Sequence, residues 1–106
     1  MGQLKNILID AVPALQAVEK KIEAMPETVL DGWVDSITFN DGSYLVTYAL
    51  DVENEAGDGD WETEFKLYVV TDGECVEVET AEFELLNRDA LDLSEHIPDL
   101  MEQVNE

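Results

Sequence analysis

The chain has 106 residues, of which 45% are hydrophobic, and carries 26 Asp or Glu against 5 Lys or Arg, a formal net charge of -21. This length fits a single domain over residues 1–106, and the apolar content predicts a folded core rather than a disordered chain. The negative charge argues against direct binding to nucleic acid or to an anionic membrane, because both carry the same sign.

The compartment is predicted from three features that the sequence lacks. No run of apolar residues is long enough for a membrane span, and the N-terminus leads into an amphipathic pattern rather than a signal peptide. Cys75 is the only cysteine, so no intrachain disulfide can form. These features favour a cytoplasmic protein.

Residues 4–25 are predicted to form a helix. Its apolar residues recur in steps of three and four along one stripe, namely Leu4, Leu8, Ala11, Leu15, Val18, Ile22 and Met25. Pro13 leaves two alternatives, a kinked helix or a helix that starts near Asp10 with the proline in its first turn. We expect the stripe to cover a sheet, with a dimer seam as the alternative. Pro26 is predicted to end the helix.

A first hairpin is predicted over residues 29–52, with Asp41 and Gly42 as its two loop residues. The register then pairs Phe39 with Tyr44, Ile37 with Val46, Asp35 with Tyr48 and Trp33 with Leu50. Apolar positions of both strands share one face. The aromatic residues Trp33, Tyr44, Tyr48, Trp61 and Phe65 are therefore expected mostly in the core, although Trp61 is also a candidate anchor at an interface.

A second hairpin is predicted over residues 61–85 around Asp72 and Gly73. Its apolar face would pair Val69 with Val76, Leu67 with Val78 and Phe65 with Thr80. Its other face would pair Val70 with Cys75, Tyr68 with Glu77, Lys66 with Glu79 and Glu64 with Ala81. That second face is markedly acidic, and an acidic loop over residues 53–60 joins the two hairpins.

The segment from Asn87 onward is predicted to be helical, with Asn87 and Ser94 as candidate N-caps and Pro98 in a first turn. The element order is then α-β-β-β-β-α. The predicted fold class is α+β, a four-stranded antiparallel sheet of two hairpins flanked by an N-terminal and a C-terminal helix. One or both helices would cover its apolar face.

The negative charge is concentrated after the first helix. Residues 1–30 contain four acids and three bases, whereas residues 31–106 contain 22 acids and two bases. Like charges opposed across strands destabilise a sheet by up to about 1 kcal/mol per pair, so an acidic sheet face indicates a partner that reads the charge. A solvated acidic surface, kept for solubility or high salt, is the alternative interpretation.

We therefore hypothesise a nucleic-acid mimic whose carboxylates occupy the Lys and Arg side chains of a basic nucleic-acid-binding protein. The expected partner-binding residues are Glu53, Glu55, Asp58, Asp60, Trp61, Glu62, Glu64, Glu77 and Glu79. Alternate residues of a strand lie about 6.8 Å apart, close to two rises of a DNA strand.

The chain is similar in size and charge to small acidic phage inhibitors of host nucleases and CRISPR effectors, a resemblance of composition alone. It implies an inhibitor that blocks the DNA- or RNA-binding site of a host defence protein. The alternatives are an immunity protein against a basic nuclease toxin and a small acidic secretion or assembly chaperone. A monomer and a homodimer both fit the sequence.

An enzyme is not expected, because His96 and Cys75 are single and have no catalytic partner at a recognisable spacing. Carboxylates near Cys75 would disfavour its thiolate, and one Cys with one His makes a poor zinc site. Asp51, Glu53, Glu55 and Glu62 match positions of a calcium loop, but Ala56 stands where that loop requires glycine. The sequence predicts neither a metal nor a cofactor.

Overall fold

The computed structural model describes residues 2–25, 29–53 and 59–105. These residues form an α+β fold with a five-stranded antiparallel sheet in the order β4-β3-β2-β1-β5. The elements are α1 (Gly2–Glu23), β1 (Val29–Asn40), β2 (Ser43–Glu53), β3 (Trp61–Thr71), β4 (Glu74–Glu77), α2 (Thr80–Asn87), β5 (Leu91–Asp92), the 3-10 helix η1 (Ser94–His96) and α3 (Ile97–Val104). The α+β class is confirmed. The prediction of four strands is wrong because it missed β5, and the predicted element order missed helix α2.

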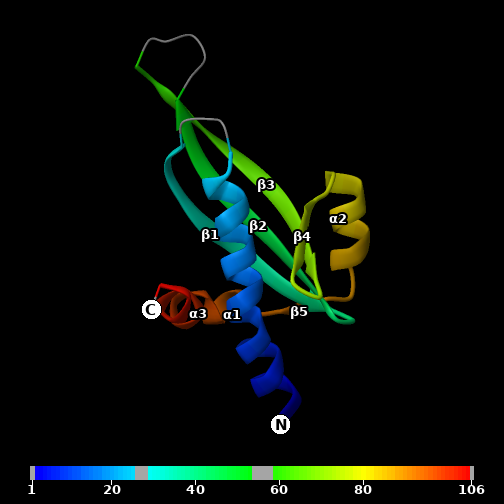
Figure 1. The fold of residues 1–106 in the computed structure, drawn as a ribbon. Helices are drawn as coiled ribbons and strands as arrows, with labels where there is room; N and C mark the ends of the chain where they lie inside the picture. Colours follow the sequence, from blue (N-terminus) through cyan, green and yellow to red (C-terminus); the bar gives the residue numbers. More distant parts are fainter. Residues whose placement is uncertain (1, 26–28, 54–58, 106) are drawn as a thin grey trace.

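The main core lies between α1 and one face of the sheet, with α3 packed beside α1 (Figure 1). The apolar stripe of α1 is buried from Ala11 to Ile22. This confirms that the stripe covers the sheet, and the dimer-seam alternative is wrong for that part of the helix. The helix is continuous through Pro13, so the alternative start near Asp10 is also wrong.

Both Asp-Gly turns form as predicted. Asp41 and Gly42 have φ values of 47° and 84°, and Asp72 and Gly73 have values of 53° and 80°. Positive φ at both central residues is the type I′ geometry whose twist matches that of the flanking strands. The turns therefore fix the register of the adjacent residues.

A β-bulge changes the register of the first hairpin away from its turn. The pairs of Phe39 with Tyr44 and of Ile37 with Val46 are confirmed, whereas those of Asp35 with Tyr48 and of Trp33 with Leu50 are wrong. A register shift between Val34 and Ser36 leaves Asp35 as the extra residue in the described ladder. One extra residue turns the following side chains to the other face. Trp33 consequently lies opposite Ala49.

The second hairpin is shorter than predicted. The pairs of Val69 with Val76, Val70 with Cys75 and Tyr68 with Glu77 are confirmed, and those of Phe65 with Thr80, Lys66 with Glu79 and Glu64 with Ala81 are wrong. The Val78 N–H donates to the Leu67 carbonyl at 2.9 Å, and the chain then turns into α2. Within this helix Phe83 is buried.

Helix α2 covers part of the sheet face opposite α1 (Figure 1). The Asn40 side-chain amide donates to the Leu86 carbonyl at 2.7 Å, and the Thr38 hydroxyl donates to the Asn87 side-chain carbonyl. Asn87 thus ends a helix that it was predicted to begin. None of the described helices is long and apolar enough to cross a membrane.

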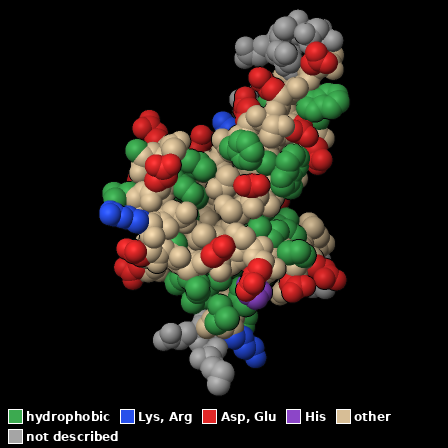
Figure 2. All heavy atoms as spheres, turned by 180° about the vertical axis from the view of Figure 1, so that it is seen from behind, with side chains coloured by type: hydrophobic (Ala, Val, Ile, Leu, Met, Phe, Trp, Pro, Cys, Tyr) green, Lys and Arg blue, Asp and Glu red, His purple; other side chains and the backbone are tan. Residues whose placement is uncertain are grey.

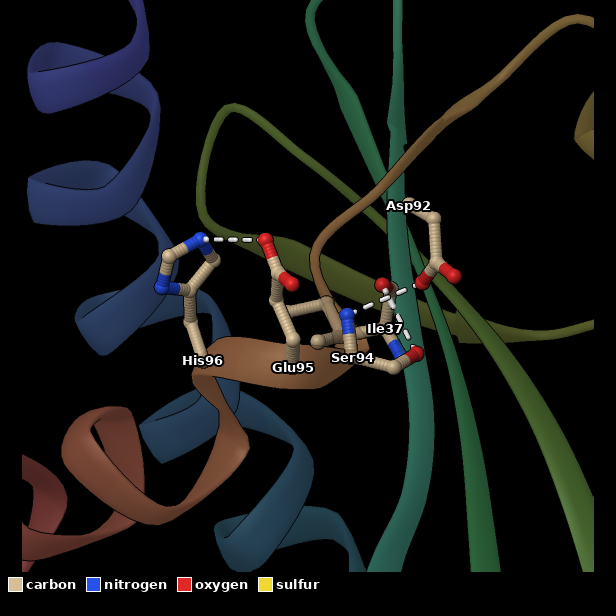
Figure 3. A network of polar contacts seen from close by, with 5 residues as sticks. All are labelled: Ile37, Asp92, Ser94, Glu95 and His96. Carbon is tan, nitrogen blue, oxygen red and sulfur yellow. Dashed lines mark hydrogen bonds and ion pairs between the residues drawn. The ribbon is translucent and has the colours of Figure 1, made fainter.

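The C-terminal segment is joined to β1 by a group of hydrogen bonds (Figure 3). The Leu93 N–H donates to the Ile37 carbonyl at 2.9 Å, and the Ile37 N–H donates to Ser94 Oγ at 3.2 Å. The Ser94 N–H donates to Asp92 Oδ1 at 2.9 Å, and hydrogen bonds from Ser94 lower the pKa of the Asp92 carboxyl. Ser94 therefore begins η1 rather than capping a helix, while Pro98 lies in the first turn of α3 as predicted.

Candidate partner-binding surface

The side chains of β3 divide the predicted site residues between two faces. Glu62 and Glu64 lie opposite Val52 and Leu50 on the face toward α1, and Trp61 lies on the other face. On the α1 face the same strand continues into core residues that are only 2% exposed, Tyr68 and Val70. The face predicted to be markedly acidic is thus the core face, with carboxylates at its far end.

The four strand carboxylates predicted to stand together are separated in the structure. Glu77 lies opposite Tyr68, and its Oε2 is 3.8 Å from Lys66 Nζ. Glu79 belongs to no strand, because it immediately precedes α2. Glu62 and Glu64 remain neighbours along β3, so only this half of the predicted group is assembled.

Two further predicted residues lie where β2 ends and β3 begins. Glu53 is exposed and lies opposite Trp61, and Asp60 is exposed just before β3. Glu55 and Asp58 lie outside the described residues. The structure therefore brings Glu53 and Trp61 together at one end of the sheet, on the face opposite α1.

That face carries an exposed surface that was not predicted from the sequence. Its rows across the strands are Trp33, Ala49 and Phe65, then Asp31, Asp51 and Thr63, then Glu53 and Trp61. We call the acidic and aromatic members of these rows, Asp31, Trp33, Asp51, Glu53, Trp61 and Phe65, the acid–aromatic face. Figure 2 shows this side of the molecule, with hydrophobic and acidic side chains interleaved in the upper part of the view.

The aromatic side chains of this face are largely open to solvent. Trp33 is 43% exposed, Phe65 is 59% exposed and Trp61 is 61% exposed, so the expectation that these three lie in the core is wrong. Tyr44 and Tyr48 are buried as expected. Exposed aromatic groups are characteristic of sites where proteins bind one another.

Two of the three carboxylates of this face accept local hydrogen bonds. The Thr63 hydroxyl donates to Asp51 Oδ1 at 2.7 Å, and the Gly32 N–H donates to Asp31 Oδ1 at 2.8 Å. Residues 22–65, which include β1 and β2, contain twelve Asp or Glu and no Lys, Arg or His. The acid–aromatic face therefore combines fixed negative charge with exposed aromatic area.

The acid–aromatic face contains four residues that were not predicted from the sequence to belong to a surface, namely Asp31, Asp51, Trp33 and Phe65. Asp51 had a signal, because it alternates with apolar neighbours along β2. Trp33 had no such sequence signal, because the side of the sheet on which its side chain lies depends on the bulge at Asp35.

The residues considered for chemistry lie apart from this surface. His96 Nε2 is 3.4 Å from Glu95 Oε1 next to the network that fastens η1 to β1 (Figure 3). Burial raises the pKa of the Cys75 thiol, while Lys21 opposes this shift, so the predicted effect of neighbouring carboxylates is not the main cause. Within residues 2–25, 29–53 and 59–105 no group of three or more His, Cys, Asp or Glu is arranged to hold a metal ion.

No protein-family model, curated protein or solved structure matches this chain.

Proposed function

We propose that this protein is an inhibitor that binds the basic nucleic-acid-binding site of another protein. The observation that carries the proposal is the half of the sheet built from residues 29–35, 50–53 and 60–65, which bears exposed carboxylates and no basic side chain. A site that normally binds phosphates presents Lys and Arg, and these side chains are complementary to such a surface.

Strand geometry supports this mimicry. Glu62 and Glu64 are alternate residues of β3, which places their Cα atoms about 6.8 Å apart. This spacing is close to two rises of about 3.4 Å along one DNA strand. Because β2 and β3 pair without a register shift from Ser43 to Trp61, the carboxylates sit on an ordered support and less entropy is lost on binding.

The aromatic residues favour a protein as the partner. Trp61 and Phe65 would enter apolar pockets beside the basic side chains of the target, where large aromatic groups contribute much of the affinity. Charge alone would steer the encounter, and the aromatic contacts would select one basic protein among many. A host nuclease or a CRISPR effector is the target class that we propose, and the protein itself would perform no catalysis.

The alternative of a chaperone acting through the apolar stripe of α1 loses most of its surface, since Ala11, Leu15, Val18 and Ile22 are buried against the sheet. An immunity protein against a basic nuclease toxin would use the same acidic surface. The identity of the protein captured from host lysate separates this alternative from the proposed inhibitor.

The test is capture of partners from host lysate with the tagged protein at low and high salt, followed by mass spectrometry. We expect a nucleic-acid-binding protein that is captured at low salt and released by added DNA or RNA. Capture that withstands high salt and ignores nucleic acid would contradict the proposal.

A further inference from the structure

Strand β3 has an outer edge that is only partly paired. Strand β4 pairs with β3 from Tyr68 to Thr71, and one further bond joins the Val78 N–H to the Leu67 carbonyl. Beyond it, no described strand pairs with this side of residues 61–66, because the chain turns into α2 after Glu79. The position that a longer β4 would have occupied is vacant among the described elements (Figure 1).

The backbone groups on this open edge can be identified from the ladder. In an antiparallel pair, alternate residues direct both their N–H and their C=O groups to the same neighbour. The Leu67 carbonyl faces β4, so two-residue alternation directs the backbone groups of Thr63 and Phe65 to the open side. Those of Glu62 and Glu64 face β2.

The opposite edge of the sheet differs, because β1 is irregular. Its pairing with β2 shifts between Val29 and Asp31 and again at the bulge containing Asp35, whereas the β2–β3 register is continuous. Bulges and charged side chains protect an edge strand against further pairing. The regular edge of β3 has no such bulge between Trp61 and Thr71.

We propose that the β3 edge from Trp61 to Lys66 pairs with an extended segment of a partner protein in which apolar and basic side chains alternate. Strand addition of this kind gains affinity from backbone hydrogen bonds and specificity from alternate side chains. Apolar residues of the added strand would lie beside Phe65 and Trp61, which are 59% and 61% exposed. Its basic residues would lie on the other face beside Glu62 and Glu64.

The charge of the edge argues against a second copy of this chain as the occupant. Pairing of two such edges would bring Glu62 and Glu64 of both copies together, and like charges on neighbouring strands destabilise a sheet. A basic strand converts the same contacts into attraction. The inference goes beyond the proposed function, because it does not require that the partner bind nucleic acid.

Amide hydrogen exchange of the full chain, resolved by NMR, tests the edge. In the free protein we expect the amides of Thr63 and Phe65 to exchange faster than those of Glu62 and Glu64. A nine-residue peptide of alternating Lys and Val, acetylated and amidated, should slow exchange at Thr63 and Phe65 at least tenfold. A peptide of the same composition with all its lysines in one block is the control, and should leave these amides unprotected.

The matched variants are Thr63→Pro and Thr63→Ala. Both lose the hydrogen bond to Asp51, but only proline removes the outward N–H, and proline is tolerated where a strand N–H faces away from the ladder. Thr63→Ala should bind the alternating peptide as the parent does, and Thr63→Pro at least tenfold more weakly.

Equal binding by both variants, or slow exchange of Thr63 and Phe65 in the free protein, would overturn strand pairing. If Thr63→Pro still captured a partner that nucleic acid releases, the proposed mimicry would stand without strand pairing. If the alternating peptide paired with β3 but nucleic acid released no captured partner, strand pairing would stand without the proposed mimicry.

Discussion

The sheet face opposite α1 has two halves that are built from the same three strands and differ in what covers them. Near the Asp-Gly turns, α2 packs on the sheet and Leu45 and Phe83 are buried. Toward the other end, Trp33, Trp61 and Phe65 lie exposed among carboxylates. The comparison indicates that the covered half contributes stability and that the bare half is available for recognition.

The largest expected difference comes from removing one phenylalanine from each half. Phe83→Ala should lower the free energy of unfolding by about 3–5 kcal/mol, because a buried ring is lost and a cavity remains. Phe65→Ala should cost about 1 kcal/mol or less, since its ring is mostly in water. Urea denaturation measures both values, and similar costs would contradict the division.

A second expected effect concerns Gly32, which precedes Trp33 on β1 but lies on the α1 side of the sheet, opposite Leu50. A Cβ built there would come within 2.8 Å of Tyr48 Cε1 and 3.1 Å of Leu50 Cδ2. Gly32→Ala should therefore lower stability by about 1–3 kcal/mol through overpacking. Asp35→Ala, at the exposed bulge, is the control and should change stability by at most about 0.5 kcal/mol. If Gly32→Ala is as stable as this control, the close packing beneath the bare half is wrong.

A third expected effect is a pH dependence of stability that arises from Tyr44, on the α1 side of the sheet. The Tyr44 hydroxyl donates to the Ile7 carbonyl at 2.5 Å, and burial, with a contribution from Asp10, raises its pKa to about 12. The unfolded chain ionises near pH 10, so this stabilisation is present below pH 10 and is lost as pH rises from 10 to 12. Tyr44→Phe should cost about 1 kcal/mol at pH 7 and reduce the alkaline loss.

Part of that alkaline loss should remain in Tyr44→Phe. Burial also raises the pKa of Tyr48, whose hydroxyl donates to Glu19 Oε1 at 3.0 Å. Thermal melts of parent and variant at pH 8, 10 and 11 compare the two slopes. Identical slopes would mean that the Tyr44 phenol is not buried as described.

The smallest expected effect is that of the ion pair between Lys66 and Glu77. The Glu77 side chain is 55% exposed and the charged atoms are 3.8 Å apart, a geometry in which an ion pair contributes little. Lys66→Met should change the free energy of unfolding by at most about 0.5 kcal/mol at 0.15 M salt. A loss above 2 kcal/mol would place this pair in the core of the fold.

The parts of the fold that the sequence predicted correctly depend on local signals. The stripe of α1 and the two Asp-Gly turns carry their own periodicity and dihedral preference, and the register is right close to each turn. The bulge at Asp35 has no local sequence signal, and it becomes visible only in the pairing of β1 with β2.

The C-terminal half depends on tertiary contacts, which explains why it was predicted less well. The segment after Val78 alternates like a strand, yet it forms α2, which packs on the sheet and in which Phe83 is buried. Strand β5 has only two residues and is held by its pairing with β1. No local sequence pattern predicts that pairing. For the candidate site, the structure has acidic residues next to Trp61, as predicted from the sequence. The prediction that Glu77 and Glu79 lie with Glu62 and Glu64 is wrong.

The most direct test of the central claim compares two charge-reversed proteins with the same net charge. One carries Glu53→Lys, Glu62→Lys and Glu64→Lys in the part of the sheet built from residues 29–35, 50–53 and 60–65, and the other carries Glu84→Lys, Asp89→Lys and Glu102→Lys at exposed positions on and after α2 and on α3. Both are measured for capture of the nucleic-acid-binding partner at one salt concentration. We predict that the first protein loses capture at least tenfold and the second retains it, whereas equal loss in both would mean that bulk charge, and not this surface, binds the partner.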